Sequence, residues 1–426
     1  MTWALTVAFL ATLALGIPVA FCLALSSLVF LLLSGDIPLH LIPQRMFTGM
    51  DSFPLMAVPF FILAGELMNS AGITQKIVRF STALVGHIRG GLAHVNIVAS
   101  MFFAGISGSA VADTAALGSI LIPAMEKDGY SKTFSAAVTA SSSVIGPIIP
   151  PSIPVVIYAL VGSVSVGGLF LAGVVPGVLI GVGLMVVAYV LAKKHGYGTK
   201  QPRVSFGEFV QALWGAIIPL LMPLIILGGI LSGVFTPTEA ASVAVAYAVV
   251  VGLLVLRTLK LSDLPGIFYR SMLTTSTILM VMACANIFSW ILGTEMIPQK
   301  VAKVITSLSE NPYVLLLLIN LLLFVVGCFL EGLAAIIIMV PILLPIAQHA
   351  GIDPIHFGIV VVMNLMIGLI TPPLGLCLFV CCSVSKVDLV ELVRANMPFL
   401  LVELATLFFV AYVPRAVLFL PRLFGY

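Results

Sequence analysis

The chain has 426 residues, of which 61% are hydrophobic and only 8% are charged, and its net charge is +3. Soluble globular proteins carry roughly a quarter charged residues, so this composition excludes a soluble globular protein, and the small net charge gives no indication of a basic tail or a nucleic-acid-binding face. The apolar runs are long enough to span a bilayer, which takes about 20 residues each, and they predict an all-α polytopic membrane protein.

These runs predict membrane spans along the chain. The first, from Trp3 to Leu33, lacks the basic start and short apolar core of a signal peptide, so it is predicted to be a retained membrane helix. The other spans are predicted over residues 51–70, 133–161, 168–192, 213–232, 238–256, 271–292, 355–384 and 394–420. All six cysteines lie in apolar runs, so neither a disulfide framework nor a transition-metal site is expected.

Two further apolar stretches, 92–125 and 313–347, are too long for one crossing and too short for two. A helix of about 34 residues would reach about 51 Å, whereas the bilayer core is about 30 Å thick. Each stretch also contains a break near its middle, GISGSA at 105–110 and GCFLEG at 327–332. Both are predicted to be re-entrant helical hairpins whose tips lie inside the membrane.

An internal repeat relates the two halves of the chain. An ungapped shift of 222 residues places Gly146 on Gly368 and the Pro-Pro pair at 150–151 on the pair at 372–373. The same shift matches Phe102 with Phe324, Gly105 with Gly327, Pro123 with Pro345, Gly129 with Gly351, and Pro176 with Pro398. Because glycine and proline mark backbone breaks, the matches predict two structural repeats, over residues 51–192 and 275–420.

The charges of the loops predict that the two repeats are inverted. The loops 193–203 and 257–270 carry lysine and arginine, whereas the turn 232–238 carries neither. The positive-inside rule places both loops in the cytoplasm and the turn outside. The first hairpin then enters the membrane from the cytoplasm and the second from the opposite side. Inverted repeats with broken helices are typical of secondary transporters, which bind substrate and ion near the midplane.

Each hairpin is followed by a proline-rich break in a predicted helix, IGPIIPPS at 145–152 and IGLITPPLG at 367–375. Proline removes a backbone N–H and clashes with the preceding turn, so carbonyl groups are left without partners. Free carbonyls suit a dehydrated Na⁺, and the N-termini of half-helices suit a carboxylate. A simple proline kink is the alternative, but two breaks at equivalent repeat positions favour an ion site.

Several polar residues of these segments are candidates for a site. In the first tip, Ser107 and Gly108 favour a functional role, whereas Ser109 is equally compatible with helix packing. Asp113, one turn later, is interpreted as a brace for the tip, and Glu331 lies in the second tip.

The motifs at 105–131, 145–159, 169–177, 235–242 and 367–375 resemble the large membrane subunit of tripartite ATP-independent periplasmic (TRAP) transporters. The resemblance covers essentially the whole chain. It implies a Na⁺-driven importer in which a transport domain containing both hairpins slides against a scaffold, as an elevator. It also implies a small four-helix membrane subunit and a periplasmic binding protein that delivers an organic acid such as a C4-dicarboxylate or a sialic acid. The location is then the bacterial inner membrane.

Carried over to this chain, the resemblance implies two Na⁺ regions with the substrate carboxylate between the tips. The expected Na⁺-binding residues are Gly105, Ser107, Ser109, Gly146, Ile149, Pro150, Gly327, Cys328, Glu331, Gly332, Gly368 and Thr371. The expected substrate-binding residues are Ser107, Gly108, Ser141, Ser142, Ser152 and Asn364. No cofactor is expected besides Na⁺ as the coupling ion.

The corresponding domain division has five parts. Residues 1–50 form an N-terminal scaffold helix and interfacial arm, and residues 391–426 a C-terminal scaffold helix. The first transport repeat is 51–167, the second is 271–390, and 168–270 are scaffold helices.

Two other functions are alternatives to transport, an intramembrane serine protease and an ion channel. G-x-S-G at 105–108 matches the nucleophile motif of intramembrane serine proteases, but none of the six histidines lies in the middle of a later apolar span to act as base. An ion channel needs a continuous pore, which a single-chain inverted repeat fits less well. The expectation is therefore a transporter and not an enzyme.

Overall fold

The computed structural model describes all residues except 1, 36, 199–202, 298 and 301–310, so Lys200 in the predicted cytoplasmic loop lies outside the described residues. All regular secondary structure in the described part is helical, and eight of its helices are long and apolar enough to cross a membrane. The predicted all-α polytopic fold is therefore confirmed.

The N-terminal segment differs from the prediction of one helix from Trp3 to Leu33. Two helices, α1 (Thr2–Ala14) and α2 (Val19–Ser34), pack against each other instead. Gly16 between them takes a positive φ of 75°, and Pro18 follows it, so the helix cannot continue through this point.

Two helices were not among the predicted spans, and a third divides one of those spans. α3 (Leu41–Met50) packs along α13 (Leu264–Thr294), and α5 (Ile73–Val85) packs against α6 (Gly91–Ser107). Between them, a 3₁₀ turn at Phe53–Met56 leads into α4 (Ala57–Ser70), which fits the span predicted at 51–70. The third, α20 (Pro414–Leu423), follows α19 (Leu389–Tyr412), so the predicted span 394–420 is in fact divided at Pro414.

The first repeat contains the predicted hairpin and broken helix. The hairpin consists of α6 (Gly91–Ser107) and α7 (Ala110–Lys127), and the broken helix consists of α8 (Lys132–Ser143) and α9 (Ile153–Gly162). The second repeat has the same order. Its hairpin is α15 (Pro312–Phe329) and α16 (Gly332–His349), and its broken helix is α17 (Pro354–Gly368) and α18 (Leu376–Ser385).

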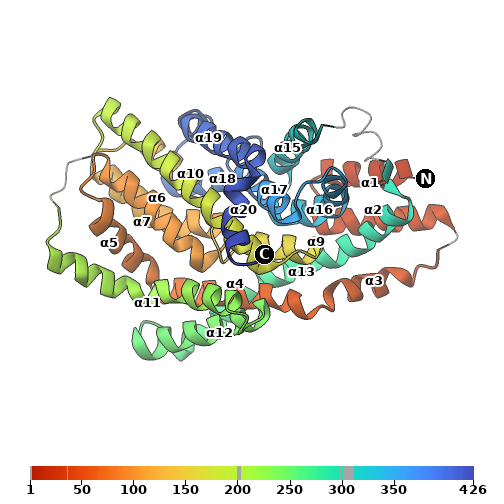
Figure 1. Ribbon diagram of the computed structural model, residues 1–426, viewed down its shortest axis with the longest axis horizontal. Coiled ribbons are helices and arrows are strands. Elements are labelled where there is room, and N and C mark those ends of the chain that lie inside the picture. The colour runs from red at the N-terminus through yellow and green to blue at the C-terminus, as the bar shows by residue number, and fades with distance from the viewer. Residues whose placement is uncertain (1, 36, 199–202, 298, 301–310) are drawn as a thin grey trace.

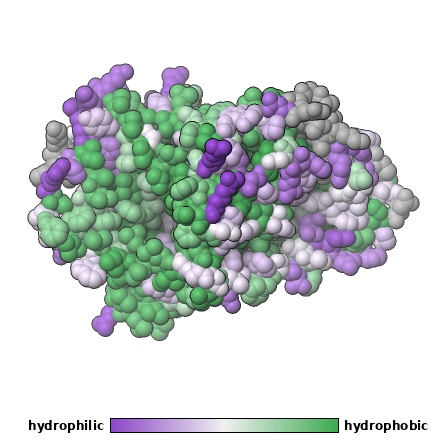
Figure 2. Space-filling view, viewed as in Figure 1, coloured by the Kyte–Doolittle hydropathy of each residue, from purple (hydrophilic) through white to green (hydrophobic). Residues whose placement is uncertain are grey.

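Long helices connect and surround these units. They are α10 (Val166–His195), α11 (Phe206–Leu231), α12 (Pro237–Val250) with a π-helical end to Val255, and α13. On α10, Val182, Val186 and Val190 are exposed at four-residue spacing, which makes one apolar face for lipid. Figure 2 shows that hydrophobic residues cover much of the left and central part of the molecular face in view.

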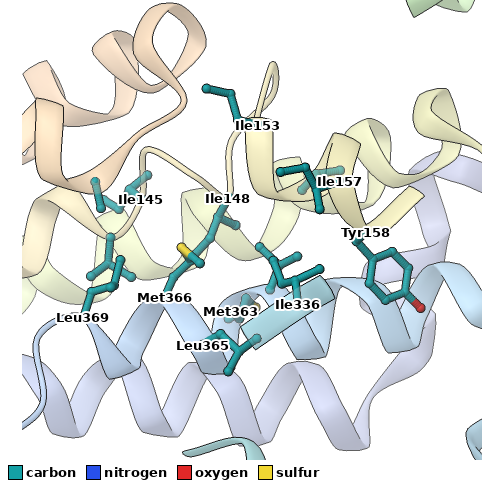
Figure 3. Packing of buried hydrophobic residues seen from close by; sticks show 14 of the residues in the cluster. Ile145, Ile148, Ile153, Ile157, Tyr158, Ile336, Met363, Leu365, Met366 and Leu369 are labelled. Atoms are coloured by element: carbon teal, nitrogen blue, oxygen red, sulfur yellow. The ribbon is translucent and has the colours of Figure 1, made fainter. Parts of the chain in front are cut away.

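The two hairpins lie on opposite sides of the centre of the molecule, with α6 and α7 to the left and α15 and α16 to the right in Figure 1. The core joins the two breaks: Ile145 and Ile148 of the first break point toward Leu369 and Met366 of the second repeat (Figure 3). Helix packing divides around this core. α10 and α19 pack against the hairpins and broken helices, whereas α12 and α13 pack against α4; the two sets meet where α13 contacts α16 and α4 contacts α6. The division into transport and scaffold domains stays a prediction.

Candidate functional site

The first hairpin reverses at Ser107–Gly108–Ser109. α6 ends at Ser107, and Gly108 takes the left-handed conformation, with a φ of 60°, that favours glycine. Ser109 then caps α7, because its hydroxyl accepts the backbone N–H of Ala112 at 3.4 Å. Small residues are required here because the chain turns around within three positions.

Asp113 connects this tip to the first break. Its side chain is fully buried, and its Oδ1 accepts a hydrogen bond from the Ser107 hydroxyl. Its Oδ2 faces Gly146 so closely that a Cβ at that position would overlap it, and it has no hydrogen-bond partner among the described residues. The contact with Ser107 is the one that a tip brace requires.

The break between α8 and α9 presents carbonyl groups to the same tip. No described residue donates a hydrogen bond to the carbonyl of Pro150 or Pro151. A Cβ at Gly105 would lie 3.5 Å from the Pro150 oxygen, and one at Gly108 would lie 3.2 Å from the Pro151 oxygen. Two free carbonyl oxygens therefore lie against two glycines of the first hairpin, and oxygen ligands of this kind suit a hard cation.

Other residues of the first break hold its shape. Ser152 donates to the carbonyl of Pro147 and accepts the N–H of Val155 at 3.3 Å, which caps α9. Ile149 packs against Gly177 of α10. Ser152 is thus a structural cap as well as a predicted substrate ligand.

The second tip is closed by an acidic cap. Glu331 accepts the N–H of Ala334 at 3.1 Å and so caps α16. Gly332 lies against Met366, and the carbonyl of Cys328 accepts the N–H of Leu374 at 3.4 Å. These contacts hold the tip beside the second break.

The second break touches its hairpin through the backbone. A Cβ at Gly368 would lie 2.5 Å from the carbonyl carbon and oxygen of Gly327, so the two backbones touch directly. Thr371 donates to the Ile367 carbonyl at 2.9 Å, and the Ile370 carbonyl accepts from Asn396 at 3.3 Å. Both breaks contain a cis peptide between their paired prolines.

A cavity of about 650 Å³ lies between the two tips. The N-terminal ends of α7, α9 and α16 all line it, and α4 and α13 form the facing wall. Its charged lining residues are Glu66 and Glu331, and it is lined by no lysine, arginine or histidine of the described chain. Converging helix N-termini supply N–H groups and positive partial charge, so the cavity can bind an anion without a basic side chain.

The structure brings only some of the predicted residues to this cavity. Ser107, Gly108, Ser109 and Glu331 line it. Gly105, Gly146, Ile149, Pro150, Ser152, Gly327, Cys328, Gly332, Gly368 and Thr371 lie in the tips and breaks behind it.

Three predicted substrate ligands point between helices instead of lining the cavity. Ser141 donates to Asn396 at 2.6 Å, Ser142 accepts from Ser100 at 2.9 Å, and Asn364 donates to the side chain of Asn320 at 2.7 Å. Each is fully or almost fully buried, and each joins a broken helix to a neighbouring helix.

Sequence reasoning missed several residues around the cavity. The Pro151 carbonyl is as free as that of Pro150, although only Pro150 was predicted. Thr274 and Thr277 of α13 also line the cavity, and their three-residue spacing in an apolar helix was the signal that could have identified them.

Replacing Asn320 by alanine is expected to destabilise the second repeat by about 1–3 kcal/mol, since the buried amide of Asn364 would lose a partner. Replacing both asparagines by leucine is expected to recover most of that loss. Thermal unfolding of the purified single and double variants in detergent measures both effects, and strictly additive losses would contradict the pairing.

Comparisons with known proteins agree on one family. The family described as "Tripartite ATP-independent periplasmic transporter, DctM component" matches residues 6–416. The large permease protein SiaM of a sialic acid TRAP transporter from Vibrio cholerae is 46% identical over 412 residues, covering 96% of each chain. The large permease protein DctM of a C4-dicarboxylate TRAP transporter from Pseudomonas aeruginosa is 43% identical over 407 residues, covering 95% of this chain and 94% of that protein.

Solved structures show a similar fold at low identity. The YdaH transporter of Alcanivorax borkumensis matches with a TM-score of 0.64 and 14% identity, covering 96% of this chain and 98% of that chain. MtrF of Neisseria gonorrhoeae matches with a TM-score of 0.61 and 14% identity, covering 87% and 83% of the two chains. At such identity the match concerns the fold alone.

Proposed function

Because the chain belongs to the DctM component family of tripartite ATP-independent periplasmic transporters, we propose that it is the large membrane subunit of a Na⁺-coupled importer of an organic acid. Membership of the family and the eight apolar helices make it a multi-pass protein of the inner membrane. Relatives are named for sialic acid, C4-dicarboxylate and isethionate, all of which are anions. A sialic acid or a C4-dicarboxylate is the proposed substrate class.

The observation that carries this proposal is the convergence of three helix N-termini on a cavity between the two tips. An imported carboxylate must be held by positive potential, yet the cavity is lined by no basic side chain of the described residues. The helix N-termini supply that potential in a low-dielectric setting, and a bound Na⁺ behind the tip adds to it.

The proposed Na⁺ region lies where the first tip meets the first break. The free carbonyls of Pro150 and Pro151, with the hydroxyls of Ser107 and Ser109 nearby on the tip, offer the oxygen ligands that Na⁺ needs. Ion binding there would hold the tip against the break, and the tip lines the substrate cavity. This contact is the physical basis for coupling ion binding to substrate binding.

An elevator movement is proposed for alternating access. The hairpins and broken helices pack against α10 and α19, while α12 and α13 pack against α4, and the two groups meet where α13 contacts α16 and α4 contacts α6 and α9. We therefore propose that α10 and α19 travel with the hairpins, although their sequence had suggested scaffold helices. The proposed partners are a small membrane subunit of the same transporter and a periplasmic binding protein that hands over the substrate.

The test is uptake by proteoliposomes that contain the full complex, with succinate and a sialic acid as probes. Saturable uptake that requires a Na⁺ gradient is expected for one of them. A flux that does not saturate, or that is unchanged without Na⁺, would contradict the proposal.

Replacing Pro150 and Pro151 together by alanine is expected to weaken Na⁺ coupling. The restored N–H groups can donate to the carbonyls of Gly146 and Pro147, which would extend helix into the break and displace the carbonyls of residues 150 and 151 from the tip. Losing about 1.4 kcal/mol of ion binding would raise the half-saturating Na⁺ concentration about tenfold. Pro219→Ala is the matched control, because Pro219 lies inside α11 and the helix continues through it without a break. An unchanged Na⁺ dependence in the double variant would count decisively against this Na⁺ region.

A further inference from the structure

A second cavity, of about 400 Å³, lies beside α13 and is separate from the cavity between the tips. α3, α9, α13 and α16 supply its walls, together with the 3₁₀ turn before α4. Its polar lining residues are Thr48, Ser52, Asn286 and Ser289, and it is lined by no charged residue of the described chain.

One stripe of α13 connects the two cavities. Thr274, Thr277, Ile278 and Val281 line the first cavity, and Met282, Ala285, Asn286 and Ser289 line the second. Spacing of three and four residues places all of them on one face of the helix. At about 1.5 Å per residue, the nine steps from Thr277 to Asn286 extend about 14 Å along the helix axis. The stripe is polar at both ends and apolar between them.

The loop charges predict that the two cavities lie at different depths of the membrane. Arg257 and Lys260 in the loop before α13 place its N-terminal end in the cytoplasm by the positive-inside rule. The first cavity is lined by the earlier part of the stripe and the second by the later part. The second cavity is therefore the one nearer the periplasm.

The polar groups of the second cavity differ in whether they are satisfied: the Thr48 hydroxyl donates to the Gln44 carbonyl at 2.8 Å, whereas two polar side chains of α13 have no partner among the described residues. The side chains of Asn286 and Ser289 make no hydrogen bond with any described residue. Gly49 of α3 leaves room for Asn286, because a Cβ at position 49 would lie only 2.5 Å from the Asn286 Cβ. An amide and a hydroxyl that face a cavity without partners can bind water or a polar ligand.

The second hairpin runs along the same stripe. Glu331, Leu333 and Ala334 at its tip line the first cavity, and Ile337 and Pro341 further along α16 line the second. α16 and α13 therefore run in the same direction past the two cavities. A shift of α16 along α13 toward the periplasm would bring the tip beside Asn286 and Ser289.

We propose that the second cavity is where the substrate binds when the transporter is open to the periplasm. In that state the hairpin tips lie beside the C-terminal part of α13, and Asn286 and Ser289 contact the organic acid. This inference rests on the proposed transport function and adds the residues of α13 that would contact the substrate while the hairpins move past them. An amide N–H and a hydroxyl donate to carboxylate or hydroxyl oxygens of the substrate. Thr274 and Thr277 have the equivalent role at the cytoplasmic end.

Thiol cross-linking tests the movement of the tip without any substrate. The experiment uses the full complex with the six native cysteines replaced. Leu333→Cys is combined in turn with Ile278→Cys, with Ser289→Cys and with Ser276→Cys. Ser276 is the control, because it is exposed and lines neither cavity. A short bismaleimide is expected to join the first two pairs and not the third. The Leu333/Ile278 product also reports that the protein is folded. If that product forms and the Leu333/Ser289 product never does, the proposal is overturned.

Transport kinetics test the substrate contact itself. Asn286→Ser with Ser289→Ala is expected to raise the half-saturating concentration of succinate or a sialic acid about fivefold for uptake from the periplasmic side, because hydrogen bonds are lost there. Exchange from the cytoplasmic side is expected to stay within about twofold, as for Ser276→Ala. Equal effects on both sides, or none on either, would overturn the assignment. If the unaltered complex transports neither probe, the proposed function fails, whereas the cross-links still decide whether the tip reaches Ser289.

Discussion

Replacing Gly368 by alanine is expected to abolish uptake, because no side chain fits between the second break and the second hairpin. A Cβ at Gly368 would lie 2.5 Å from the carbonyl carbon and oxygen of Gly327 and 2.8 Å from its Cα. These are backbone atoms, so no side-chain rotation can relieve the overlap. The hairpin must move away from the break, and overpacking of this kind typically costs about 1–3 kcal/mol.

The measurement has two parts, Na⁺-dependent uptake and thermal unfolding of the purified complex. Gly228→Ala in α11 is the matched control, since a Cβ there meets nothing within 4 Å and alanine favours the helix. We expect the control to transport normally. Normal uptake by Gly368→Ala would show that the close approach of the two backbones is not needed for transport.

Asp113→Ala is expected to cause the second large loss, because the first tip is tied to the core through this side chain. The substitution removes the acceptor of the Ser107 hydroxyl and leaves a void at a fully buried position. A lost buried hydrogen bond together with a void destabilises by about 2–4 kcal/mol. Uptake and the melting temperature should both fall.

Asp113→Asn separates a brace from an ion ligand. Asparagine keeps the shape and the carbonyl acceptor for Ser107 but removes the negative charge. For a brace, we expect the half-saturating Na⁺ concentration to stay within about threefold of the unaltered value, since no ion ligand is lost. A rise of tenfold or more would identify Asp113 as a Na⁺ ligand, and the orphaned Oδ2 would then be the ligand atom.

The sequence predicted the hairpins and breaks well because glycine and proline act locally. Proline removes an N–H wherever it stands, and glycine permits a reversal such as that at Gly108, so these residues locate interruptions without any tertiary information. The same reasoning failed at the N-terminus. The apolar run from Trp3 to Leu33 predicted one helix, but Gly16 and Pro18 divide it into two.

The predicted ligands in the turn line the cavity, whereas three of those on helices do not. Ser107, Gly108 and Ser109 reach the cavity because the turn itself directs them. Ser141, Ser142 and Asn364 lie on helices, where the direction of a side chain depends on how the helix is rotated against its neighbours. Packing turned all three toward adjacent helices, a result that residue type and repeat position could not reveal.

By itself the sequence determined the membrane class, the duplicated plan and the positions of the backbone breaks, because apolar length, glycine and proline act within a few residues. Only the tertiary structure decided what those breaks face. The carbonyls of Pro150 and Pro151 lie against the first tip, and the stripe of α13 joins two cavities, because segments distant in the sequence pack side by side. Such contacts depend on the geometry of packed helices, and a single sequence does not specify that geometry position by position.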